Sequence, residues 1–161
     1  MLSTEYMVEP SSDRRAVFRG VVSLALHDGN LSFGEKRLIT KLAMALRLDD
    51  DEPKMIYDAI LEEEKLEDGH PLTISEKFTA YEQVLETFLI NTNKTDDELR
   101  MIAYLRRVFE ISDSEHRAIL SSLDRQLEDI VHRNVKQSIR FELKEINKRL
   151  SEILESVRIQ R

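Results

Sequence analysis

The chain has 161 residues and a formal net charge of −7, with 34 % of its residues charged and no cysteine. This length suffices for one domain with a sizeable core, and the lack of cysteine excludes disulfides and cysteine-ligated zinc. The acidic balance argues against a general nucleic-acid binder, which needs a basic face. No run approaches the 18 or so apolar residues of a membrane span, and Glu5 and Glu9 interrupt any signal-peptide core, so we expect a cytoplasmic protein.

Residues 1–12 are predicted to form an N-terminal tail or a short lead-in helix that ends at Pro10. Apolar residues at helical spacing then predict a first helix over about 13–27. Gly20 lies inside this helix and costs about 1 kcal/mol relative to alanine, which indicates the close approach of another helix. Gly29 suits the positive φ of the turn that ends the helix.

Capping boxes mark the starts of the next two helices. Ser32 with Glu35 is the first box, because a serine at the N-cap and a glutamate three residues on satisfy each other's backbone N–H groups. Asp49 with Glu52 is expected to be the second box and to open a helix over about 50–66. The first half of the chain therefore predicts a unit of three helices.

The sequence matches itself when it is shifted by 63 residues without a gap, and such self-similarity fixes the architecture. Identical residues in the two copies include the pairs Val21 and Val84, Asn30 and Asn93, Glu35 and Glu98, Ile39 and Ile102, and Asp50 and Asp113. Thr73, Thr95 and Ser112 each precede a glutamate by three residues and open the helices of the second copy. We predict an all-α bundle of tandem duplicated units, 13–66 and 76–123, within a domain over 13–130.

The end of the chain, residues 131–161, is predicted to be a helical extension, because no glycine or proline follows Pro71. Its apolar residues follow a heptad pattern typical of a coiled coil: Ile139, Leu143, Ile146, Leu150, Ile153 and Val157. We call these six residues the C-terminal seam. A phase shift indicates a stutter, a kink or a break near 131–138. The seam is expected to fold back on the body, pair with a twin or bind another protein.

A metal site is one hypothesis for the first turn. The segment from Asp28 to Glu35 matches the second half of a calcium-binding loop, but Leu24 and Leu26 stand where that loop needs acidic ligands. A looser divalent-cation site would use Asp28 and Glu35, with Glu98 in the second unit. The alternative is that these groups only cap helices.

Other chemistry has weaker signals. The acidic runs 49–52 and 62–68 would attract cations or a basic partner, but a solvated face with favourable helix-start charges is the preferred explanation, more so for the first run than for the second. Histidines 27, 70, 116 and 132 show no ligand spacing, and the sequence holds neither a glycine-rich phosphate loop nor a nucleophile motif. We therefore expect no enzyme.

Two stretches carry a resemblance to a known family: Leu26-His27-Asp28-Gly29-Asn30-Leu31 followed by Glu35, and Leu46-Arg47-Leu48-Asp49 followed by Glu52. They resemble the tellurite-resistance TerB-like family. The resemblance implies an all-α bundle of two units and a non-catalytic module linked to stress responses and membrane-associated complexes. It also implies metal binding through Asp28, Glu35 and Glu98, although Asn91 replaces the aspartate in the second unit.

Together these observations predict a TerB-like scaffold that self-associates or binds a protein partner through its C-terminal helix. The alternative is an ion-responsive module with a divalent cation at the acidic turn. General nucleic-acid binding is not expected, and any membrane association is expected to run through partners.

Overall fold

The computed structural model describes residues 6–90, 94–128, 133–154 and 157–159, and for residues 6–7, 28, 127–128, 133–143 and 157–159 it describes the backbone only. The described part is all-helical, as predicted, apart from two three-residue strands. Its elements are β1 (Tyr6–Val8), α1 (Arg14–Ala25), the 3₁₀ turn η1 (Leu26–Asp28), α2 (Phe33–Ala45), α3 (Glu52–Leu61), α4 (Ile74–Leu89), α5 (Asp96–Val108), α6 (Asp113–Glu128), α7 (Arg133–Leu154) and β2 (Val157–Ile159).

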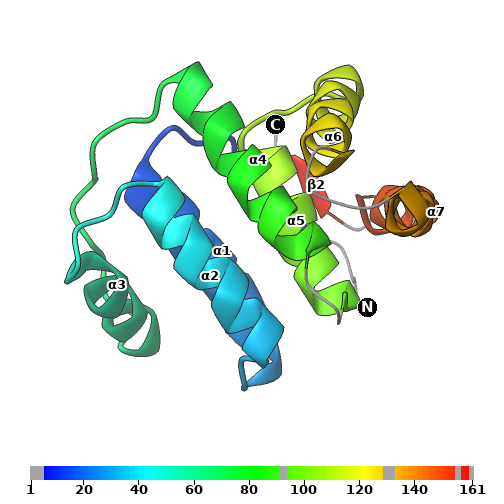
Figure 1. Cartoon of the computed structure of the whole chain (residues 1–161). Helices are drawn as coiled ribbons and strands as arrows, with labels where there is room; N and C mark the ends of the chain where they lie inside the picture. Colours follow the sequence, from blue (N-terminus) through cyan, green and yellow to red (C-terminus); the bar gives the residue numbers. More distant parts are fainter. Residues whose placement is uncertain (1–5, 91–93, 129–132, 155–156, 160–161) are drawn as a thin grey trace.

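Helix α5 lies at the centre of the bundle. It packs against α1, α4 and α7 and touches α2, and it is buried on most of its circumference. Figure 1 shows α4 and α5 crossing the middle of the molecule, with α1, α2 and α3 on one side and α6 and α7 on the other. The close approach expected at Gly20 is confirmed, because a Cβ there would lie 2.0 Å from the hydroxyl oxygen of Tyr104 on α5.

The capping boxes fix where the helices begin. The boxes of Ser32, Thr73 and Thr95 form in full and open α2, α4 and α5. The box at Asp49 forms only in part, since Glu52 accepts from the Asp49 N–H at 2.8 Å while Asp51 stands at the N-cap without a side-chain bond.

Helix α3 ends earlier than expected. It stops at Leu61 rather than near residue 66, because Glu63 adopts a left-handed φ of 54° and the Glu64 N–H turns back to the Ala59 carbonyl at 2.9 Å. Further helix would place more carboxylates at the negative end of the helix dipole. The acidic run therefore lies beyond the helix.

Similar turns recur 63 residues apart. Helices α2 and α5 both have 13 residues and begin and end at matching positions. Each is followed by a residue with left-handed φ, Arg47 at 57° and Glu110 at 54°. The next N–H then returns to the helix, from Leu48 to the Ala43 carbonyl and from Ile111 to the Arg106 carbonyl.

The described residues of the N-terminal segment, 6–12, form neither the tail nor the lead-in helix expected for residues 1–12. Strand β1 pairs in parallel with β2, and Val8 is fully buried. The Ser11 N–H also donates to the Val108 carbonyl at 3.1 Å, next to the end of α5. Residues 6–11 thus belong to the body of the domain.

The helix described in the C-terminal extension, α7, packs back on the body of the domain. Helix α6 ends at Glu128 and α7 begins at Arg133, and residues 129–132 between them are outside the described part. Helix α7 packs along α5 and contacts α6. Ile146, Leu150 and Leu154 are buried there, so α7 supplies part of the hydrophobic core.

The substitution Leu150→Ala should therefore destabilise the whole domain. Leu150 is 1 % exposed, and removing a fully buried leucine side chain costs about 2–5 kcal/mol of unfolding free energy. Glu152→Ala, an exposed site on the same helix, should change it by less than about 0.5 kcal/mol. Urea denaturation measures both unfolding free energies. If Leu150→Ala changes the unfolding free energy as little as Glu152→Ala does, α7 does not belong to the cooperative body.

Candidate functional site

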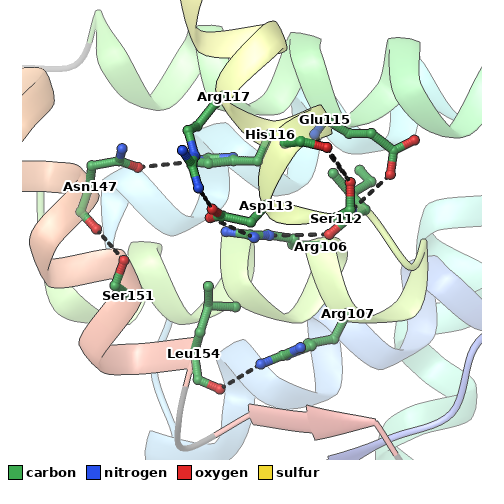
Figure 2. A network of polar contacts seen from close by, with 12 residues as sticks. Arg106, Arg107, Ser112, Asp113, Glu115, His116, Arg117, Asn147, Ser151 and Leu154 are labelled. Carbon is green, nitrogen blue, oxygen red and sulfur yellow. Dashed lines mark hydrogen bonds and ion pairs between the residues drawn. The ribbon is translucent and has the colours of Figure 1, made fainter.

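A chain of three polar side chains joins α4, α6 and α7. The Tyr81 hydroxyl lies 2.8 Å from Nδ1 of His116, and Nε2 of His116 lies 3.0 Å from Oδ1 of Asn147. Because that amide oxygen only accepts, Nε2 carries the proton and Nδ1 accepts from the tyrosine. Figure 2 shows His116 reaching from α6 to Asn147 on α7. We call these three residues the His116 centre.

Burial sets the charge of this centre. His116 is 1 % exposed, and burial lowers the pKa of its imidazole, because a charged ring loses its hydration there. Nearby Arg106 lowers that pKa further, whereas the hydrogen bond to Asn147 opposes the shift. Burial raises the pKa of Tyr81. The centre is therefore neutral at pH 7 and acts as an interhelical clamp.

Arg106 closes the turn between α5 and α6. It is buried, its Nε donates to the Ile111 carbonyl at 3.2 Å, and its Nη2 lies 3.3 Å from an Asp113 carboxylate oxygen. Asp113 also pairs with Arg117, and this bond is the largest cause of the lowered pKa of Asp113. Figure 2 shows these side chains beside the His116 centre. The charges pair within the chain and hold two helices together.

A second polar cluster ties the segment after α3 to α1. Its cavity of about 280 Å³ is lined by Arg14, Arg15, Arg47, Asp49, Glu52, Asp68, Gly69 and His70. Arg14 donates to the Leu46 and His70 carbonyls at 2.8 and 2.7 Å, and Arg15 Nε lies 2.6 Å from a Glu52 carboxylate oxygen. These guanidinium groups of α1 bind oxygens of the same chain, so they hold the neighbouring segments against α1.

Two of the residues suggested for a metal, Glu35 and Glu98, occupy capping positions. Glu35 accepts from the Ser32 N–H at 3.0 Å, and Glu98 accepts from the Thr95 N–H at 3.1 Å. Both carboxylates are buried, and Glu98 also lies against the start of α2, since a Cβ on Gly34 would be 2.6 Å from its Oε1.

The described geometry gives these acids a capping role. Among the side chains that the structure describes, no group of three metal-type ligands occurs. The side chain of Asp28 is outside the described part. The cation site at Asp28, Glu35 and Glu98 stays a prediction.

The C-terminal seam is covered where it is described. Ile146 and Leu150 are buried against α5 of the same chain, and Ile153 packs against the core. They do not form a free partner surface in this structure. The side chains of Ile139, Leu143 and Val157 lie outside the described residues, so partner binding by the seam stays a prediction.

The outer side of α2 carries an exposed face that the sequence analysis did not single out. Phe33, Arg37, Thr40 and Met44 follow one another at helical spacing and are all exposed. We call these four residues the α2 face. The signal in the sequence was their spacing of four, three and four, opposite the buried Leu38 and Leu42.

Two grooves border the α2 face. One, of about 470 Å³, lies between α2 and α4, and Lys36, Lys41, Thr87 and Ile90 line it together with the α2 face. The other, of about 270 Å³, lies between α2 and α3. Thr40 and Met44 line both grooves, so the grooves meet along α2.

Comparison with known proteins leaves the identity open: no family model, no curated protein and no solved structure matches the chain. The likeness to the TerB-like family rests on the motifs alone. Within the described residues, every helix is too short or too polar to cross a membrane.

The His116 centre should make the stability of the protein depend on pH. A lowered histidine pKa means that the unfolded chain binds the proton more tightly, so stability is present above about pH 6.5 and falls as the pH drops below it. The slope should approach about 1.4 kcal/mol per pH unit. Denaturant titrations between pH 8 and pH 5 measure the unfolding free energy.

The substitution His116→Gln is the matched control, since glutamine does not titrate. It should remove the dependence above pH 5 and leave the acid loss below about pH 4.5, where Glu52, Glu76 and Asp113, whose pKa values are lowered, become protonated. A wild-type protein with constant stability from pH 8 to pH 5 would contradict the neutral, buried His116.

Proposed function

We propose that this chain is a non-catalytic, TerB-like interaction module that holds a partner protein against the α2 face. The observation that carries the proposal is the exposure of three large apolar side chains along one groove. Phe33 is 80 % exposed, Met44 is 69 % exposed and Ile90 is 54 % exposed. Contiguous exposed apolar surface in a groove is typical of a binding site.

The groove has an anchor-and-rim arrangement. Lys36, Arg37 and Lys41 lie beside the apolar anchors, although the chain as a whole is acidic. Burying one large apolar side chain contributes about 1.5–3 kcal/mol, so each anchor is worth about a factor of ten or more in affinity. The basic rim would orient a partner that carries negative charge.

We further infer that the bundle arose by duplication of a three-helix unit. The 63-residue self-match, the equal lengths of α2 and α5 and their matching closing turns support this. In this interpretation the two units share one arrangement of helices and differ in what covers their outer faces. The C-terminal helix covers the outer face of the second unit, and the α2 face of the first unit binds the partner.

Site-specific photocrosslinking in the cells that make the protein tests the proposal. A benzophenone amino acid in place of Thr40 should give adducts of defined mass with another polypeptide, because Thr40 lies where the two grooves meet. The same label at Ser121, an exposed position on α6, is the control and should give none of them.

The substitution Phe33→Glu should abolish the adducts formed from position 40 without changing the melting temperature, since Phe33 is exposed. Identical adducts from positions 40 and 121, or none from position 40, would contradict a partner site on α2.

A further inference from the structure

The position of α7 on the second unit indicates what the first unit binds. Arg107 and His116, which bond to α7, correspond 63 residues earlier to Met44 and Pro53, and both of these residues line the groove between α2 and α3. The full lining of this groove is Phe18, Ile39, Thr40, Ala43, Met44, Leu48, Asp49, Asp50 and Pro53, and the 63-residue shift places these residues on Tyr81, Ile102, Ala103, Arg106, Arg107, Ile111, Ser112, Asp113 and His116.

Helix α7 occupies this position on the second unit. His116 bonds to Asn147 of α7, and Arg107 donates to the Leu154 carbonyl at 3.3 Å. Figure 2 shows both contacts, one from α6 and one from α5. Between them, Ile146 and Leu150 are buried, and α7 lies along α5 and touches α6. The arrangement of helices in the second unit therefore accommodates an amphipathic helix at this position.

The equivalent position on the first unit is open. There the groove of about 270 Å³ lies between α2 and α3, and Met44 and Thr40 are exposed on its edge. No helix within the described residues packs on α2 in the way that α7 packs on α5. We propose that this groove binds an amphipathic helix of a partner protein, in the pose that α7 adopts on the second unit. The inference rests on the proposed function and names its ligand.

The differences between the two sites indicate how the side chains of the partner's helix differ from those of α7. Pro53 stands where His116 bonds to Asn147, and Phe33 stands where Asp96 pairs with Arg149 of α7. Ala43 stands in place of the buried Arg106. The changes at Pro53 and Phe33 each replace a polar contact to α7 by an apolar side chain, so the ligand helix has a broader apolar stripe than α7.

Charge selects the flank of the ligand helix. Lys36, Arg37 and Lys41 line the adjoining groove towards α4, whereas the charged residues that line the groove between α2 and α3 are Asp49 and Asp50. A helix whose edge towards α4 is acidic matches the basic side of this site. The helix α7 of a second copy fits poorly, because its Asn147 and Arg149 would lose their partners and its exposed Lys144 and Lys148 would add positive charge.

A synthetic peptide tests the proposal directly. The probe is a fluorescein-labelled peptide with the sequence of residues 141–156, carrying Asn147→Leu and Arg149→Leu to widen the stripe and Lys144→Glu and Lys148→Glu to make its flank acidic. A peptide of the same composition with its apolar residues scrambled is the control. Fluorescence anisotropy with the full chain should give at least tenfold tighter binding for the probe than for the scrambled peptide.

Two substitutions in the protein locate the site. Met44→Glu should weaken binding of the probe at least tenfold, because it places a charge where the two grooves meet. Ile74→Glu changes an apolar residue that is equally exposed, at 73 %, but lies outside both grooves, so it should change the affinity less than twofold. Arg37→Glu should weaken the acidic probe more than a version that keeps Lys144 and Lys148.

Several results would overturn the inference. The probe could bind no better than the scrambled peptide, or Ile74→Glu could weaken it as much as Met44→Glu. Light scattering could instead show a dimer that Met44→Glu dissociates, in which case the occupant is a second copy. If crosslinking at position 40 captures a partner while the probe fails, the proposed function stands and the helical ligand alone is wrong.

Discussion

The burial of α5 is the constraint on which the rest of the structure depends. A helix that is buried on most of its circumference needs neighbours on every side, and here α1, α4 and α7 supply them. Its buried charges also need partners inside the chain. Glu98 caps the helix through Thr95, and Arg106 binds the Ile111 carbonyl and Asp113 beyond the other end. The return of the C-terminal helix therefore completes the core.

Local signals in the sequence predicted the helix starts well because the forces behind them are local. The capping boxes at Ser32, Thr73 and Thr95 involve groups three residues apart, so they form wherever the helix forms. Gly29 has the positive φ of 93° expected of it. The end of α3 was predicted several residues too far along the chain, because a glutamate in the sequence does not indicate the left-handed backbone conformation that Glu63 adopts.

The contacts between residues far apart in the chain could not be predicted from the sequence. The heptad pattern of the C-terminal seam marked Ile146 and Leu150 as residues that something must bury, but an apolar stripe does not specify its partner. His116 carried no motif, since its partners Tyr81 and Asn147 lie 35 and 31 residues away. The α2 face was missed for a related reason. A pattern of apolar residues predicts a core more readily than it predicts which of them stay exposed.

The exposed side chains on α2 occupy positions where charged residues would stabilise the helix. In α5 the first residue is Asp96 and the last turn holds Arg107, and both charges favour the helix dipole. The matching positions in α2 hold Phe33 and Met44, which forgo that stabilisation and leave apolar surface in water. Folding alone gives no reason for two such choices at both ends of one face, 11 residues apart. A ligand that buries both side chains does, because the stabilisation lost in the free domain is then recovered on binding.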